Sequence, residues 1–173
     1  MRPDARLEVC LQPLRAAQFE RLAALAGRIW REHYPGIISH AQIDYMLRGR
    51  FAPAALERYL HADRQWLDLL YRGDAPIGYC SYACADDPEV LKLEQLYLGA
   101  EQRGRGYGSL MLRHVESRAR AMGVRRIVLT VNKANAASIA VYAARGFEVR
   151  AEIRVDIGEG FVMDDYVMEC ALS

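Results

Sequence analysis

Apolar and polar residues alternate at the start of the chain and then change to a helical spacing. Leu7, Val9 and Leu11 alternate with polar residues, which is the period of a half-buried strand, and Pro13 closes the run. Between residues 15 and 30, apolar side chains recur at steps of three and four, which predicts an amphipathic helix. The pattern therefore begins with a strand followed by a helix.

Two shorter helices are indicated next. The turn at residues 34–36 ends the first helix, and Ser39 with Gln42 matches a capping box, so a second helix is predicted from residue 40 toward residue 47. Pro53 suits the first turn of another short helix over residues 54–61. Helical segments thus fill the stretch before the next strands.

The remaining chain mixes strands with two further helices. Strands are expected at residues 65–71 and 77–85, joined by Arg72-Gly73-Asp74 as a tight turn, and at 90–98. A helical stripe over 110–122 ends at Gly123, a β-branched strand follows at 127–131, and a helix over 136–145 ends at Gly146. Strands at 147–155 and 161–172 complete the pattern. The summary order is β-α-α-β-β-β-α-β-α-β-β, an α/β class without repeats or linkers, so residues 1–173 are expected to form a single domain.

Composition narrows the function classes. With 23 Lys and Arg against 22 Asp and Glu, the chain has no global positive field for nucleic acid, and we expect no such partner. No apolar stretch reaches membrane-spanning length and no export signal is visible, so we expect no membrane association. The cysteines form no CxxC pair or zinc-like spacing, which predicts buried, reduced thiols, a cytoplasmic protein and no metal site: Cys10, Cys80, Cys84 and Cys170.

A glycine-rich segment between a strand and a helix carries the first chemical signal. Glycines let backbone N–H groups turn toward a phosphate, and the following helix N-terminus adds a favourable dipole. Two arginines supply positive charge nearby. A plain turn is the alternative. The P-loop ending GK[ST] and the GxGxxG spacing are both missing, which removes most nucleotide sites. The segment is Gln102-Arg103-Gly104-Arg105-Gly106-Tyr107-Gly108-Ser109.

This segment resembles the coenzyme A signature [QR]-x-x-G-x-[GA] of the GCN5-related N-acetyltransferase (GNAT) family. A second pattern, N-x-x-N-x-x-[AS]-x-x-x-Y-x-x-x-G-[FY], is matched downstream by Asn132, Asn135, Ser138, Tyr142 and Gly146-Phe147. The resemblance covers nearly the whole chain. It implies a mixed, mostly antiparallel central sheet with helices on both faces, and acetyl-CoA as co-substrate.

The resemblance also assigns roles to residues. Asn135 would contact the pantetheine arm, Ser138 would share a helix face with Tyr142, and Tyr142 would be the general acid near the sulfur. An N-cap and a packing aromatic are the structural alternatives for Asn135 and Tyr142. The strand end before the loop would meet the acyl carbonyl and pantetheine through its backbone. The implied coenzyme-binding set is Leu96, Tyr97, Leu98, Arg103, Gly104, Arg105, Gly106, Tyr107, Gly108, Ser109, Asn135 and Ser138.

Glu94 is the candidate catalytic base, because a position two residues before Leu96 on one strand shares its face. A pairing arginine, solvent exposure or an ordered water acting as base are the alternatives. His114 falls among polar helix positions and is expected at the surface. His33 and His40 flank the turn at 34–36 and are candidate substrate contacts.

The acceptor is less defined. Residues 30–47 and the C-terminal run 156–166 resemble a bacterial subgroup that includes polyamine acetyltransferases, which implies a small-molecule amine acceptor, such as a polyamine. Acidic residues of the C-terminal run would attract a cation, or merely keep an edge strand from pairing. A protein N-terminal or lysine acetyltransferase and a non-catalytic acyl-CoA-binding domain are the alternatives, and the protein is expected to be a monomer or homodimer. The candidate substrate residues are Tyr34, Ile37 and Asp164.

Overall fold

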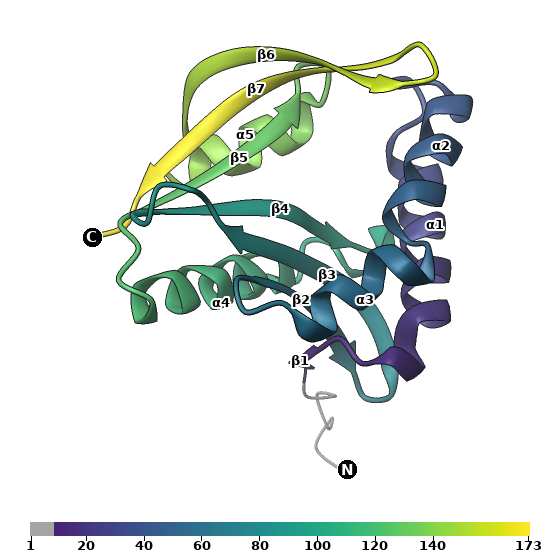
Figure 1. The fold of residues 1–173 in the computed structure, drawn as a ribbon, viewed down its shortest axis with the longest axis horizontal. Helices are drawn as coiled ribbons and strands as arrows, with labels where there is room; N and C mark the ends of the chain where they lie inside the picture. Colours follow the sequence, from purple (N-terminus) through teal and green to yellow (C-terminus); the bar gives the residue numbers. More distant parts are fainter. Residues whose placement is uncertain (1–8) are drawn as a thin grey trace, which may run out of the picture.

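The computed structural model describes residues 9–173, which form a seven-stranded sheet with the order β1-β2-β3-β4-β5-β7-β6 (Figure 1). The predicted strand position Leu7 lies outside the described residues. Strand pairs are antiparallel except for β4 and β5, which are parallel. The elements are β1 (Val9–Pro13), α1 (Phe19–His33), α2 (His40–Arg50), α3 (Pro53–His61), β2 (Gln65–Arg72), β3 (Ala75–Cys84), β4 (Val90–Leu98), α4 (Tyr107–Ala121), β5 (Arg126–Asn132), α5 (Ala136–Ala144), β6 (Glu148–Gly158) and β7 (Phe161–Ala171), with 3-10 turns at Ala16–Gln18 and Ala100–Gln102.

Three helices lie between β1 and β2, although the summary order of elements counted only two. The helix missing from that order is α3, which matches the short helix predicted after Pro53; Pro53 has the fixed φ that suits a helix start. The first helix begins later than predicted, because Gln18 Oε1 accepts from the Arg15 N–H (2.8 Å) and closes a 3-10 turn before α1. Ser39 caps α2, with its hydroxyl accepting from the Gln42 N–H at 3.1 Å, but the predicted capping box is not complete, because the Gln42 side chain donates to the Val162 carbonyl instead.

Helices cover both faces of the sheet, as expected. Apolar residues of α1, α2 and α3 pack against β2 and β3 in one cluster that includes Leu22, Trp30 and Tyr79. On the opposite face, α4 and α5 pack against β3, β4 and β5 in a second cluster. Burial of these side chains is the main term that holds the two helical layers on the sheet.

Glycines end the elements where the pattern placed them. Gly73 turns the β2–β3 hairpin with φ 60°, Gly123 ends α4 with φ 75°, and Gly146 ends α5 with φ 88°. Such positive φ values strain any residue with a Cβ, so these three positions favour glycine.

The cysteines follow the prediction in part. All four are free thiols, Cys80 is buried, and Cys84 packs against the same cluster. Cys10 is exposed, so the expectation of buried thiols is wrong for it; it lies on β1 at the edge of the sheet. Within residues 9–173, no helix is long and apolar enough to cross a membrane.

Candidate active site

The site lies where β4 and β5 separate. These parallel strands pair only from Val90↔Arg126 to Leu93↔Leu129, although β4 continues to Leu98 and β5 to Asn132. The unpaired ends leave backbone N–H and C=O groups without a sheet partner on this side, and these groups need other partners. A cleft and a cavity meet at this opening.

The glycine-loop cleft lies on the side of α4 and α5. Its wall combines the end of β4, the glycine-rich loop, the start of α4 and one face of α5. Gly104 and Gly106 have φ values of 73° and 82°, and Gly106 is the N-cap of α4. The first N–H groups of α4 have no partner within the helix, so the loop presents donors and a positive dipole end to the cleft.

The structure brings most, but not all, of the predicted coenzyme residues to this cleft. Arg105, Tyr107 and Asn135 do not line it. Tyr107 instead packs beside the buried cluster around Met111, because it opens the first turn of α4, and Asn135 lines the neighbouring cavity. Two cleft cations are Arg103, which was predicted, and Arg145, which was not. Arg145 follows α5 immediately, and only the three-dimensional fold brings it opposite the loop. The predicted residues that line the cleft are Leu96, Tyr97, Leu98, Arg103, Gly104, Gly106, Gly108, Ser109 and Ser138.

Asn135 links α5 to α1. Its Oδ1 accepts from the Ser138 N–H (3.3 Å), so it is the N-cap of α5, and its Nδ2 donates to His33 Nε2 (3.2 Å). Burial, with the positive charge of Arg103, lowers the pKa of His33, so the imidazole is a neutral acceptor. His33 lines the cleft and not the inner cavity, while His40 lines neither.

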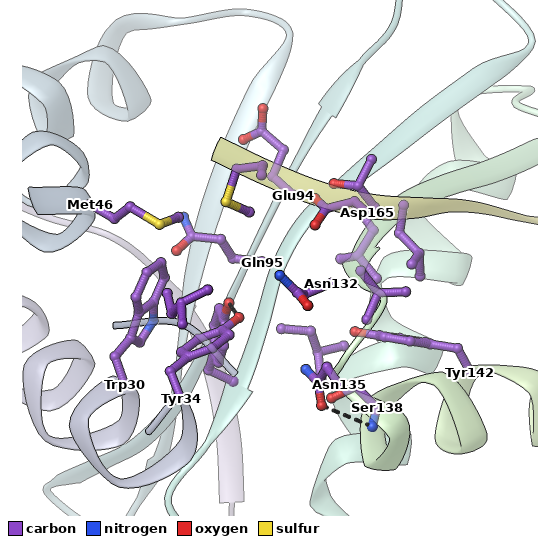
Figure 2. Close-up of a pocket in the computed structure, with 18 of the residues that line it drawn as sticks. Trp30, Tyr34, Met46, Glu94, Gln95, Asn132, Asn135, Ser138, Tyr142 and Asp165 are labelled. Carbon is purple, nitrogen blue, oxygen red and sulfur yellow. Dashed lines mark hydrogen bonds between the residues drawn. The ribbon is translucent and has the colours of Figure 1, made fainter. Parts of the chain in front are cut away.

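The inner cavity lies on the other side of the opening, among α1, α2, β4, β5 and β7 (Figure 2). Trp30 and Tyr34 come from α1 and its end, and Tyr34 and Tyr97 share a hydrogen bond of 2.6 Å between their hydroxyls. Figure 2 shows Gln95, Asn132 and Tyr142 facing the same space from β4, the end of β5 and α5. The cavity is therefore a mixed aromatic and polar chamber.

Tyr142 stands at the junction of the two spaces. It lines both the cleft and the cavity, as do Leu96, Tyr97 and Ser138. Its ring packs against Phe147 with centroids 5.5 Å apart. Burial raises the pKa of Tyr142, so its hydroxyl keeps its proton at neutral pH. A protonated phenol at the meeting point of two pockets can give a proton to an atom that sits between them.

Glu94 occupies a β-bulge, which the sequence did not reveal. Ser81 pairs with Gln95 and Tyr82 with Leu93, so Glu94 has no partner on β3. Its carboxylate accepts from the Tyr59 hydroxyl of α3 at 3.3 Å, whereas Leu96 packs on the α4 side. The expectation that Glu94 and Leu96 share a face is wrong, because the extra residue reverses the alternation. Glu94 still lines the inner cavity.

Two of the three predicted acceptor contacts lie elsewhere. Tyr34 lines the cavity, but Ile37 and Asp164 do not; their neighbours Ile38 and Asp165 do. Asp164 instead pairs with Lys133 at 3.0 Å. Asp164 and Asp165 are successive residues of β7 and point to opposite faces, so a prediction one residue out selects the wrong side chain there.

Two oxygen atoms of the inner cavity lack partners. Four buried side-chain polar atoms in the described part of the chain have no hydrogen-bond partner, and two of them, Asp165 Oδ1 and Gln95 Oε1, belong to cavity residues. Both residues are nearly buried, with 3% and 6% exposed. Burial, and the nearby Asp164 charge, raise the pKa of Asp165. Such atoms are costly when left unpaired, so these two oxygens are acceptors that a donor in the cavity can satisfy.

His114 was expected at the surface, and its side chain is 31% exposed there, but it also has a buried partner that was not predicted. Its Nε2 contacts Asp68 Oδ2 at 2.8 Å, and the same carboxylate oxygen accepts from the Tyr82 hydroxyl at 2.8 Å. Asp68 is 5% exposed and needs such partners.

Residues 9–173 hold no cluster of three or more His, Cys, Asp or Glu that could bind a metal ion.

The opened parallel strand pair, the glycine loop and the tyrosine between two pockets are the features of an acyltransferase fold that uses acyl-coenzyme A as its donor. The sequence model of the Acetyltransferase (GNAT) family matches residues 23–147. The chain belongs to this family.

Individual relatives differ in what they act on. An L-methionine sulfoximine/L-methionine sulfone acetyltransferase of Pseudomonas aeruginosa is 32% identical over 104 residues, 57% of this chain, and the match spans only 60% of that relative's length. A spermidine N(1)-acetyltransferase of Thermoplasma acidophilum is 24% identical over 83% of this chain and 90% of its own.

Solved structures share the fold. The PaiA N-acetyltransferase of Thermoplasma acidophilum, solved in complex with coenzyme A, superimposes with a TM-score of 0.80 at 20% identity, covering 95% of this chain and 99% of that one. A GCN5-related N-acetyltransferase of Rhodopseudomonas palustris gives a TM-score of 0.77 at 20% identity, covering 94% and 95%.

Proposed function

We propose that this protein transfers an acetyl group from acetyl-CoA to a primary amine of a small molecule. The observation that carries the proposal is Tyr142 at the junction of the glycine-loop cleft and the inner cavity. A donor in the cleft and an amine in the cavity would meet beside its hydroxyl. Acetyl-CoA would supply the activated acetyl group as a thioester.

The cleft fits the coenzyme on the residues present. Gly104 and Gly106 adopt a left-handed backbone, and no atom lies within 4 Å of the place that a Cβ would take at either residue, so the loop is open to a bulky anion. Arg103 and Arg145 add two cations. Backbone donors, a helix N-terminus and guanidinium groups together form a site for a pyrophosphate.

Three chemical tasks fall to residues of the opening. We assign the acyl carbonyl to the backbone of Leu96-Tyr97-Leu98, which has no partner on the β5 side and could donate as oxyanion donors do. Tyr142 holds the proton that the leaving sulfur needs. An amine with a pKa of ~10.4 is protonated at neutral pH, so a base must accept a proton, and Glu94, directly or through water, is the candidate.

The wall of the inner cavity favours a small acceptor over a protein chain. The hairpin of β6 and β7 rests on α2, where the Tyr45 hydroxyl donates to the Ile157 carbonyl and Gln42 Nε2 donates to the Val162 carbonyl at 3.0 Å. These contacts hold the hairpin, which carries the cavity residues Met163 and Asp165, against α2, so the cavity has a fixed wall on this side. Spermidine and methionine derivatives, on which the relatives act, are both small primary amines.

A thiol-release assay with acetyl-CoA tests the proposal. The panel contains polyamines, amino acids, aminoglycosides and N-terminal peptides. We expect release with at least one small amine and none with peptides. Release with peptides alone would select a protein acetyltransferase. Binding of acetyl-CoA, measured by calorimetry, without thiol release with any acceptor would select a non-catalytic binding domain.

We place the enzyme in the cytoplasm, because free thiols persist in a reducing compartment.

A further inference from the structure

Arg50 is a positively charged residue at the inner cavity, and the proposed reaction assigns it no role. It is the last residue of α2, is exposed, and its guanidinium carbon lies 5.6 Å from the centroid of the Trp30 ring. It lines the cavity, yet it forms no ion pair or hydrogen bond with the residues from 9 to 173. Several other arginines of these residues, such as Arg31 and Arg126, pair with carboxylates.

The same cavity holds its unpaired acceptors deeper inside. Asp165 Oδ1 and Gln95 Oε1 are buried without donors, and Gln95 Nε2 is already engaged with the Ser81 hydroxyl at 3.2 Å. The charge of Arg50 reaches this region, because it opposes the rise in the pKa of Asp165. One cavity thus offers oxygen acceptors inside and a free guanidinium at its edge.

We propose that the acceptor is an amino acid, with its ammonium group held by Asp165 and Gln95 and its carboxylate by Arg50. This inference rests on the proposed function and names its substrate class. An ammonium group supplies three donors for the two orphaned oxygens, and an arginine binds a carboxylate through two parallel hydrogen bonds. A polyamine would bring a second cation toward Arg50, where like charges repel. The charge pattern therefore selects a zwitterion over a diamine.

Matched acceptor pairs test this assignment. Initial rates with saturating acetyl-CoA are compared for L-methionine sulfone and 3-(methylsulfonyl)propylamine, and for L-lysine and cadaverine, which differ within each pair by the carboxylate. We expect kcat/KM to be at least tenfold higher for the amino acid of the better pair. In Arg50→Met, KM for the amino acid should rise about ten- to hundredfold, while kcat and the KM of the decarboxylated amine change little.

Arg48→Met is the matched control. Arg48 lies on the same helix two residues earlier and lines only an outer groove between α2 and the hairpin, so its removal should leave both acceptors unaffected. Melting temperatures of both variants report on folding.

The outcomes separate this inference from the proposed function. Faster acetylation of cadaverine or spermidine than of any amino acid contradicts the inference alone. Equal losses for both members of a pair in Arg50→Met also contradict it. Absence of thiol release with every amine, while acetyl-CoA binds, contradicts the proposed function and the inference with it.

A second, independent feature is the free edge of the sheet. β6 is the last strand, and most of its eleven residues are exposed on both faces, including Val149 at 47% and Val155 at 45%. An edge strand of this length presents unpaired N–H and C=O groups to other chains. Its sequence, Glu-Val-Arg-Ala-Glu-Ile-Arg-Val-Asp-Ile-Gly, alternates charged and apolar residues.

This sequence is complementary to itself. In an antiparallel pair of two copies centred on Ile153, Glu152 of each copy lies opposite Arg154 of the other. Opposite charges that face each other across strands stabilise the pair. Arg154 forms no ion pair with the described part of its own chain. Glu152 forms one with Lys133, whose Nζ lies 2.6 Å from Glu152 Oε2 and also pairs with Asp164.

We infer that β6 pairs with β6 of a second copy of this chain, so that one continuous sheet crosses the dimer. The partner is a second copy because the register that matches charges also relates the two strands by a two-fold axis. β7 is the neighbour of β6 and carries Asp165, so the dimer would also brace one wall of the inner cavity.

A charge exchange tests the pairing by sedimentation velocity. Wild type should sediment as a dimer at micromolar concentration. Arg154→Glu places four acids at the axis, and Glu152→Arg places four bases there, so each variant alone should be a monomer. A mixture of the two restores opposite charges at every contact and should dimerise. A monomeric wild type, or variants that dimerise as well alone as mixed, would overturn the inference. Retained melting transitions show that the variants are folded.

Discussion

The two sides of the β4–β5 opening differ in how they are built. The glycine-loop cleft comes largely from one stretch of chain, the end of β4, the loop and the start of α4, with α5 opposite. The inner cavity collects α1, α2, β4, β5 and β7, which are far apart in the sequence. A contiguous site is constrained by backbone conformation and leaves a local motif. A dispersed site is constrained by packing and leaves almost no local motif.

The largest effect should come from Tyr142, one of the residues that line both the cleft and the cavity. Tyr142→Phe removes the hydroxyl and keeps the ring against Phe147. We expect kcat to fall about a hundredfold or more, because a positioned proton donor typically contributes that much, with KM for acetyl-CoA nearly unchanged. Steady-state kinetics across pH check this. An unchanged kcat would show that the leaving sulfur takes its proton from water.

The next effect should be confined to the cleft. Gly106→Val forces a β-branched residue to adopt φ 82°, which costs about 1–2 kcal/mol or more and moves the loop amides. Acetyl-CoA affinity, measured by calorimetry, should fall about tenfold or more. The control is Gly123→Ala, which strains φ 75° at the other end of α4 and should lower stability without changing that affinity. Equal losses of acetyl-CoA affinity in both variants would show that the glycine-rich loop does not hold the pyrophosphate.

Glu94→Gln tests whether the bulge serves the acceptor side. We expect kcat/KM for the acceptor to fall about tenfold, less than for Tyr142→Phe, because water in the open cavity can still accept the proton. Acetyl-CoA affinity should not change. Tyr59→Phe removes the hydrogen bond to Glu94 and leaves the carboxylate, so it should have a smaller effect. A larger loss in Tyr59→Phe than in Glu94→Gln would contradict the role of Glu94 as base.

The smallest effect is one on stability. The raised pKa of Asp165 means that its contribution to stability is present at acidic pH and is lost as pH rises through the folded-state pKa. Asp165→Asn should therefore raise the melting temperature at pH 7, by about 2–4 °C for each ~1 kcal/mol gained, and by less near pH 4. Acceptor KM should rise in the same variant. A lower melting temperature at pH 7 would show that the carboxylate is satisfied in the free enzyme.

Sequence periodicity predicted the elements well and the acceptor side poorly. The strand over 90–98 has the predicted bounds, because alternation and flanking turns define it. The side-chain directions within it were wrong after Leu93, because a bulge depends on how β3 pairs and leaves no local mark. Asp164 was predicted in place of Asp165 because two adjacent acids in a strand give no local sign of which one faces the cavity. Glycine positions were predicted because positive φ is a property of single residues.

Residues at the edges of elements were the hardest to assign. Arg50 and Arg145 each stand at a helix end, where a basic residue normally needs no further explanation than the helix dipole. His114 sits among polar helix positions, and its buried partner Asp68 lies 46 residues away in the sequence. Only tertiary contacts distinguish these residues from ordinary surface charges.

The bulge at Glu94 makes strand β4 sensitive to changes in length. Leu91 and Leu93 before it and Leu96 and Leu98 after it all face α4, although their sequence parity differs. Deletion of this one residue would restore regular pleating and exchange the faces of the residues that follow, so that Gln95 would point into the apolar layer against α4. A substitution at position 94 changes one side chain, whereas an insertion or deletion there changes the direction of every following side chain of β4, the strand that separates the two substrate pockets.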